Sequence, residues 1–240
     1  MTVKRIGMIL PSSNTVVEPV CIAMATKVSA HGPCVSVHFT RFALTAVKVD
    51  NPAAAYYDSG ALLGAAKLLA DARCDAICWN GSAGGLVGFA RDRQLCREIE
   101  AATGARATTS TLALGEQFRR TGVKRFAMVT LNPPEMNETI KATFAAEGFE
   151  CVAATERTDI SDNFAMAGVA PEEIADHARQ CVRGLSNAPD ALIIYGTNTR
   201  GAPVAAMLAR ELGLPVYDSV AWGMVGALRG LDIDTATLLT

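Results

Sequence analysis

Four short segments of this 240-residue chain combine residue types that can hold a carboxylate without using charge. They are residues 11–15, 81–85, 132–134 and 196–200, and each follows an apolar run of strand length. Small residues with hydroxyl or amide groups dominate them, lysine is absent, and only the last segment contains a charged residue. Neutral donors of this kind stabilise a carboxylate or the oxyanion of an enolate. The segments therefore predict a site for a small carboxylate.

Other common ligand sites lack their sequence signals. The chain has no GxxxxGK[ST] motif and no GxGxxG motif opening a helix, so no nucleotide site is predicted. Its seven cysteines are scattered without CxxC or Cys/His spacing, which indicates neither a metal site nor a disulfide scaffold. A formal net charge of −2 gives no basic surface for nucleic acid.

The elements that must position these segments are repeated along the chain. Gly81 and Gly196 each follow Asp-Ala and an apolar run, and a small hydroxyl residue comes next. Residues 3–10 resemble residues 123–130, and residues 104–110 resemble residues 213–219, in the same order. The pattern indicates an internal duplication. Two similar halves usually bind a ligand between them, because each half offers the same loop.

Strand-like and helix-like segments alternate through both halves. Apolar runs of strand length occupy residues 6–10, 35–39, 76–79, 126–130, 192–195 and 214–217. Alanine-rich segments with helical spacing occupy residues 53–72, 91–103, 111–121, 137–148, 171–185 and 203–212. This alternation predicts an α/β protein with mostly parallel sheets covered by helices. In such sheets ligands bind beyond the carboxyl ends of the strands, where the four polar segments stand.

The chain is expected to cross between its halves twice. Residues 1–113 plus 215–240 form the predicted first α/β domain, and residues 114–214 form the second. The last helix, around residues 221–228, is expected to pack on the first domain. Residues 152–170 are polar and weakly periodic, so they are either a surface excursion or a lid over the cleft.

The composition and the lengths of the apolar runs indicate a folded protein without a membrane span. Half of its residues are hydrophobic, which is ample for real cores. The first apolar run is too short for a signal peptide, and no stretch reaches the length of a membrane span. We expect reduced cysteines, a cytoplasmic location and no membrane partner.

Several motifs carry a resemblance to a known family. Residues 6–15, Ile-Gly-Met-Ile-Leu-Pro-Ser-Ser-Asn-Thr, resemble the opening of the maleate cis-trans isomerase branch of the aspartate/glutamate racemase superfamily. Residues 79–84 and 195–200 stand where that superfamily carries its two catalytic motifs. Arylmalonate decarboxylases are relatives, and the likeness covers nearly the whole chain. It implies two pseudosymmetric Rossmann-like domains, an active site in the interdomain cleft, no cofactor and a homo-oligomer.

The departure from the family pattern is informative. Racemases and maleate isomerases carry a cysteine in each motif, and the decarboxylases carry one in the second motif only. This chain has Gly81 and Gly196 at the two places, and a glycine can neither transfer a proton nor form an adduct. Cys78 is expected to face the opposite side of its strand and to pack in the core. We therefore favour bond cleavage, either decarboxylation or water addition/hydrolysis, over racemisation.

The resemblance also implies which residues bind the substrate carboxylate. Ser82 and the backbone N–H of Ala83 match one side of the family's pocket, Thr197 and the N–H of Asn198 match the other, and Asn14 reaches in from the first strand. The remaining predicted binding residues are Ser13, Gly81, Asn132 and Gly196. A plainer alternative exists for Ser13, Asn14, Ser82 and Thr197, because serine, threonine and asparagine also cap helices.

Candidates for proton transfer are few. Asp218 and Tyr195 complete the predicted catalytic set with Ser82 and Thr197. Burial of Asp218 would raise its pKa toward a useful value, although a solvated loop carboxylate is an equal alternative. Two other functions stay open at this point: an isomerase with a replacement acid–base pair, and a non-catalytic carboxylate-binding protein or partner subunit.

Overall fold

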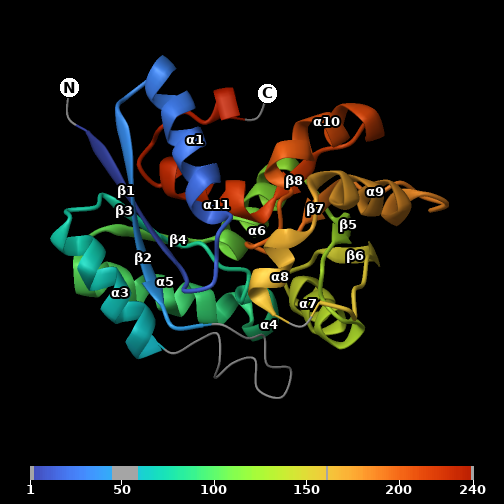
Figure 1. Ribbon diagram of the computed structural model, residues 1–240, viewed down its shortest axis with the longest axis horizontal. Coiled ribbons are helices and arrows are strands. Elements are labelled where there is room, and N and C mark those ends of the chain that lie inside the picture. The colour runs from blue at the N-terminus through green and yellow to red at the C-terminus, as the bar shows by residue number, and fades with distance from the viewer. Residues whose placement is uncertain (1–2, 45–58, 161, 239–240) are drawn as a thin grey trace.

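The computed structural model describes residues 3–44, 59–160 and 162–238, and it contains two four-stranded parallel sheets flanked by helices (Figure 1). The strand order is β2-β1-β3-β4 in the first sheet and β6-β5-β7-β8 in the second. The two orders are the same when β5 is laid on β1. The fold class expected from the sequence is therefore confirmed, and the duplication appears as a repeated topology.

The first sheet is built from the N-terminal half of the chain. Its strands are β1 (Lys4–Pro11), β2 (Val35–Phe42), β3 (Ala76–Trp79) and β4 (Arg106–Thr109). The helices of this half are α1 (Val17–His31), α3 (Ser59–Asp71), α4 (Gly84–Val87) and α5 (Phe89–Thr103). The predicted helix at residues 53–72 is found from residue 59 onward, and its first six positions lie outside the described residues.

The second sheet repeats this arrangement. Its strands are β5 (Arg125–Val129), β6 (Glu150–Ala154), β7 (Ala191–Ile194) and β8 (Val216–Asp218). Its helices are α7 (Pro134–Ala146), α8 (Asn163–Gly168), α9 (Pro171–Val182) and α10 (Ala202–Leu212). Gly213 adopts a φ of +66° directly after α10, the left-handed conformation that ends a helix.

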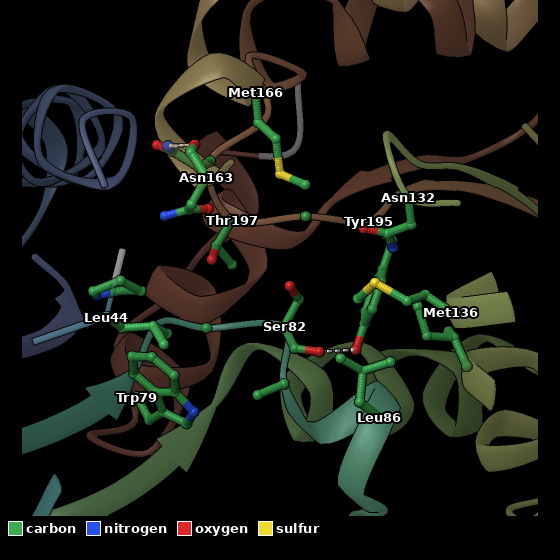
Figure 2. Close-up of a pocket in the computed structure, with 16 residues that line it drawn as sticks. Leu44, Trp79, Ser82, Leu86, Asn132, Met136, Asn163, Met166, Tyr195 and Thr197 are labelled. Carbon is green, nitrogen blue, oxygen red and sulfur yellow. Dashed lines mark hydrogen bonds between the residues drawn. The ribbon is translucent and has the colours of Figure 1, made fainter. Parts of the chain in front are cut away.

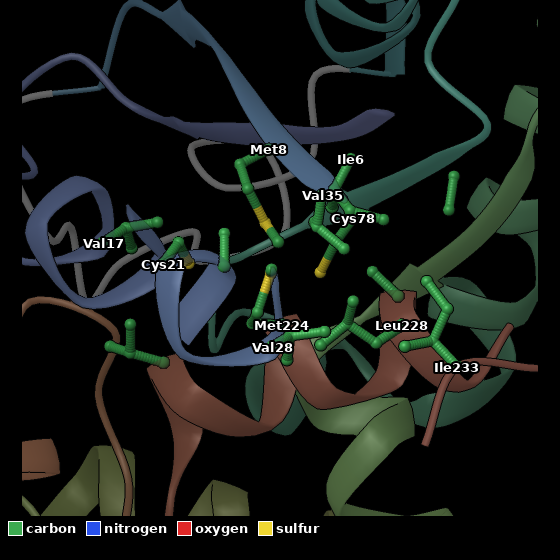
Figure 3. Packing of buried hydrophobic residues seen from close by; sticks show 14 of the residues in the cluster. Ile6, Met8, Val17, Cys21, Val28, Val35, Cys78, Met224, Leu228 and Ile233 are labelled. Carbon is green, nitrogen blue, oxygen red and sulfur yellow. The ribbon is translucent and has the colours of Figure 1, made fainter. Parts of the chain in front are cut away.

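Two helices are exchanged between the halves. Helix α6 (Ser110–Thr121) follows β4 of the first sheet, but its Phe118 packs on Phe126 of the second sheet with ring centroids 5.2 Å apart. Helix α11 (Ser219–Arg229) follows β8 of the second sheet, but its Met224 and Leu228 lie in the core with Met8 of β1 (Figure 3). The two exchanged helices also contact each other. A short 3₁₀ helix, η1 (Ala236–Leu238), then returns to α1.

The exchange of helix α11 affects where the boundary between the two domains is placed. Helix α11 packs on the first sheet, as the sequence predicts, whereas β8 pairs with β7 in the second sheet. The predicted boundary at residues 214/215 would assign β8 to the first domain. We therefore propose that the second boundary lies at residues 218/219, between β8 and α11.

The structure also contains two strands that no apolar run marks, although the likeness of residues 104–110 to residues 213–219 indicates the first of them, β4. Strands β4 and β6 are edge strands whose side chains are mostly half-buried or exposed, so they lack a continuous apolar run. Among the described residues, no helix has both the length and the apolar character needed to cross a membrane.

Candidate functional site

A small cavity lies at the carboxyl ends of β3 and β7, between the two halves of the molecule (Figure 2). Its volume is about 50 Å³, enough for a few water molecules or a small ligand. The two glycine-containing loops reach it from opposite halves. The predicted binding residues that line it are Gly81, Ser82, Ala83, Asn132, Gly196, Thr197 and Asn198.

The polar groups of these loops are available to a ligand. In Figure 2 the side chains of Ser82 and Thr197 lie on facing sides of the cavity. Neither hydroxyl makes a hydrogen bond to a described residue, and the same holds for the backbone N–H groups of Ala83 and Asn198. The site therefore offers neutral donors from both halves to whatever occupies it.

Asn14 and Ser13 do not line the cavity. Asn14 is fully buried, and its Oδ1 accepts hydrogen bonds from the backbone N–H groups of Val16 and Val17, both 3.0 Å long, where α1 begins. Its Nδ2 donates to the backbone oxygen of Thr197 over 2.7 Å. Ser13 Oγ donates to the backbone oxygen of Leu44 over 2.8 Å. Helix capping therefore describes Asn14 better than substrate binding does. The Asn14 side chain also bonds the loop that contains Thr197, and the Ser13 side chain bonds the backbone at Leu44.

Asp218 also lies apart from the cavity. Its side chain is 2% exposed, and Oδ1 accepts a 3.0 Å hydrogen bond from the backbone N–H of Ala221 at the start of α11. Burial raises the pKa of this carboxyl to about 7. The raised pKa matches the expectation for a catalytic acid, but the placement corrects the predicted role. Asp218 is a buried helix cap, because its oxygens face α11 and the start of α10 instead of the cavity.

Tyr195 lines the cavity with its ring but uses its hydroxyl elsewhere. The hydroxyl donates to the backbone oxygen of Ser82 over 2.8 Å and pairs with the Thr111 hydroxyl at the same distance. Burial raises the pKa of Tyr195 above its ordinary value, which disfavours the phenolate. In place of the predicted proton transfer, the structure gives Tyr195 the role of a brace between the two motif loops.

The described lining of the cavity holds no cysteine, histidine, carboxylate, lysine or arginine. Cys78 is fully buried in the core beside Met8, as the strand alternation predicts, and burial raises its pKa well above the ordinary value. Within the described residues, no cluster of three or more histidine, cysteine or carboxylate side chains forms a candidate metal site. The described lining residues therefore include no side chain that ordinarily exchanges a proton near neutral pH.

Both motif glycines occupy positions where a side chain does not fit. A Cβ at Gly81 would lie 2.3 Å from Cζ2 of Trp79, and a Cβ at Gly196 would lie 2.8 Å from Oγ1 of Thr199. Gly196 also has a φ of +148°, a conformation that L side chains rarely adopt. The backbone and its neighbours are thus built around glycine at both places.

Sequence reasoning offered residues 152–170 as a lid or a surface excursion, but it did not name the residues that cover the cavity. Asn163 and Met166 of α8 line it from above, within the polar stretch 152–170. Asn163 Nδ2 donates to Ser13 Oγ over 2.8 Å, and its backbone oxygen accepts from Asn198 Nδ2. Of the two alternatives for this stretch, a lid describes α8 better than a surface excursion. Asp162, the N-cap of α8, was the local signal that a helix begins there.

Comparisons with known proteins agree with this architecture. The family model of arylmalonate decarboxylase matches residues 6–238. A maleate isomerase from Nocardia farcinica is 28% identical over 98% of this chain and 93% of its own length. A maleate isomerase from Pseudomonas putida is 27% identical over 96% of this chain and 92% of its own length.

Solved structures show the same fold. A variant of the maleate isomerase Iso from Pseudomonas putida, crystallised with maleate, has a TM-score of 0.89 at 24% identity, covering 100% of this chain and 97% of that chain. A variant of the Nocardia farcinica maleate cis-trans isomerase with a covalently bound succinylcysteine intermediate has a TM-score of 0.87 at 26% identity, covering 99% of both chains. A liganded variant of arylmalonate decarboxylase has a TM-score of 0.80 at 22% identity, covering 94% of this chain and 92% of that chain. With its family model matched almost from end to end, this chain belongs to the arylmalonate decarboxylase family.

Proposed function

We propose that this protein is an enzyme that decarboxylates a small malonate-type dicarboxylate without a cofactor. One observation carries the proposal: neutral donors from both halves converge on a cavity whose described lining holds no thiol, imidazole, carboxylate or amine. Water addition or hydrolysis needs a base to activate the water. Decarboxylation begins without one, so it fits the described residues better.

In the proposed reaction, negative charge develops on the substrate oxygens next to the hydrogen-bond donors of the two loops. The bond between the leaving carboxylate and the central carbon breaks, CO₂ departs, and the electron pair moves into the remaining carboxylate to form an enediolate. The hydroxyls of Ser82 and Thr197, with the N–H groups of Ala83 and Asn198, stabilise the oxygens on which charge increases. A proton from water then converts the enediolate to the product carboxylate.

Isomerisation by thiol addition is less well supported. The solved Nocardia farcinica variant carries a succinylcysteine, a covalent adduct on a cysteine. The described residues that line the cavity of this chain include no cysteine, and both motif glycines are tightly enclosed. An isomerase of this sequence would need a different acid–base pair.

The first test is a substrate screen with two site variants. Purified protein is incubated with malonate, methylmalonate, phenylmalonate and maleate, and CO₂ and products are followed by NMR. Ser82→Ala and Thr197→Ala are each expected to lower turnover by about 10²–10³-fold, because each removes one oxyanion donor. Thr139→Ala serves as the control, since its hydroxyl bonds only the backbone of its own exposed helix turn. Turnover in both site variants equal to that of the control would refute the proposal.

A second function is favoured by the same lack of a proton-transferring side chain among the described lining residues: carboxylate binding without catalysis. Saturable binding of a malonate with no CO₂ release would select it over the enzyme.

A further inference from the structure

An apolar groove lies between α1 and α10, apart from the cavity (Figure 1). Its volume is about 710 Å³, and small-molecule sites commonly have volumes of about 300–1,000 Å³. Helices α8, α11 and η1 each add one lining residue. No residue lines both the groove and the cavity between the motif loops, so the groove is a separate candidate site.

The walls of the groove are apolar along most of their length. Pro19, Ala23 and Met24 line it from α1, and Pro203 lines it from the first turn of α10. Pro19 and Ala23 are four residues apart, so they lie on the same face of α1. The part of α1 that lines the groove, from Val16 to Met24, is about 12 Å long. The groove therefore offers an elongated surface that favours an apolar chain.

Arg200 is the one charged residue among the described residues that line the groove. It is exposed, and its guanidinium makes no hydrogen bond or ion pair with a described residue. Ala202, which begins α10 and also lines the groove, has a backbone N–H without a partner in the described part of the chain. A guanidinium and a helix N-terminus both favour an anion, and a carboxylate can accept two parallel hydrogen bonds from arginine.

We propose that the groove binds an amphipathic carboxylate. Its acid group pairs with Arg200, and its unbranched alkyl chain covers Pro19, Ala23 and Met24. The charge of the ligand complements the unpaired cation, and its chain complements the apolar walls. This inference does not rest on the proposed function, because the groove shares no residue with the cavity.

The first test locates the ligand by NMR in protein labelled with ¹³C-methyl methionine. Met24→Leu, Met136→Leu and Met166→Leu assign the three signals that are needed. On titration with octanoate, the Met24 signal is expected to move and saturate, while the signals of Met136 and Met166, which line the cavity, stay in place. A Met24 signal that does not move below the concentration at which octanoate forms micelles overturns the proposal.

The second test measures the contribution of Arg200 by calorimetry. Arg200→Gln is expected to weaken octanoate binding about fivefold to tenfold and to leave the binding of uncharged 1-octanol unchanged. Arg210→Gln is the matched control, because it removes the same charge from an exposed position of α10 that does not line the groove. Equal octanoate affinity in the two variants overturns the pairing with Arg200.

The third test measures the contribution of the apolar walls. Hexanoate is expected to bind about tenfold more weakly than octanoate, because it buries two fewer methylene groups. Ala23→Leu places a larger side chain in the groove from an exposed position, and it is expected to weaken octanoate binding at least about tenfold. Ala102→Leu, at an exposed position of α5, is expected to bind as the unaltered protein does. Equal affinity in the two variants contradicts the proposal.

Two further measurements separate this inference from other outcomes. Ser82→Ala is expected to bind octanoate as the unaltered protein does, so a failure of the proposed function leaves the groove as a site. Sedimentation velocity tests whether a second copy of the chain fills the groove instead. A dimer that Ala23→Leu dissociates would assign the groove to that second copy and overturn the proposal.

Discussion

The glycine at position 196 shows how strongly one residue constrains this site. Its φ of +148° lies in a region that residues with a Cβ rarely adopt, and Oγ1 of Thr199 stands 2.8 Å from where a Cβ would be. The backbone turn that this glycine permits directs Thr197 and Asn198 toward the cavity. A cysteine at position 196 would require the loop to adopt a different backbone conformation.

Gly196→Ala is therefore expected to lower the free energy of unfolding by about 1–3 kcal/mol, the usual cost of a strained backbone. Urea unfolding followed by circular dichroism measures the change. Gly64→Ala is the matched control, because Gly64 lies in α3 and a Cβ added there would meet no other atom within 4 Å. That substitution is expected to stabilise by about 0.5–1 kcal/mol. Equal effects at the two positions would contradict the argument.

At the scale of elements, the starts of helices account for Asn14 and Asp218, two polar residues that the sequence suggested for chemistry. Asn14 bonds the first turn of α1, Asp162 caps α8 and Asp218 caps α11. The caps differ in burial. Asp162 is half-buried and caps its helix near the surface. Asp218 is 2% exposed, and its Oδ2 has no hydrogen-bond partner among the described residues.

The buried cap makes stability depend on pH. Because burial raises the pKa of Asp218 to about 7 from 3.8, the folded chain holds its proton more tightly than the unfolded chain does. Its contribution to stability is complete below about pH 4 and is lost as the pH rises toward 7, at about 1.4 kcal/mol per pKa unit. Asp218→Asn keeps an oxygen for the N–H of Ala221 and removes the titration.

The measurement is the difference in free energy of unfolding between Asp218→Asn and the unaltered protein from pH 4 to pH 8. The variant is expected to gain stability relative to the unaltered protein as the pH rises. Asp162→Asn, which also alters a helix cap, is expected to retain the original profile. A difference that stays constant with pH would rule out the titration of Asp218.

At the scale of the whole molecule, the exchange of α6 and α11 joins the two halves. Each helix belongs to one half by connectivity and to the core of the other by packing. Tyr195 adds a link, because its hydroxyl donates to the loop after β3. The cavity lies between elements that cannot separate without exposing both cores.

We therefore expect the halves to unfold in one cooperative transition. Trp79 belongs to a core of the first sheet, and Trp222 lies in the core that contains Phe126 of the second sheet. Fluorescence of Trp222→Phe reports on the first core, and that of Trp79→Phe reports on the second. In each variant the fluorescence midpoint in urea is expected to coincide with the midpoint from far-ultraviolet circular dichroism. Separate midpoints would show that the halves unfold independently.

The sequence by itself determined the duplicated α/β architecture and the two loops that meet at the cavity. Apolar runs such as residues 76–79 and glycines such as Gly213 are local signals, so strands and helix ends can be predicted from neighbouring residues. The placement of Ser82 and Thr197 follows, because parallel strands carry their loops to the same edge. The homo-oligomer and the cytoplasmic location stay predictions.

Only the tertiary structure decided which polar groups are free to act. Asn14 and Tyr195 have suitable chemistry, but each is engaged by a backbone oxygen from the other half of the chain. Asp218 bonds the nearby Ala221, and it is packing of the fold that buries it away from the cavity. No motif marks Trp79, and only the folded chain shows that its ring fills the space beside Gly81. A side chain's partners depend on contacts between segments distant in sequence, and spacing along the chain does not encode those contacts locally.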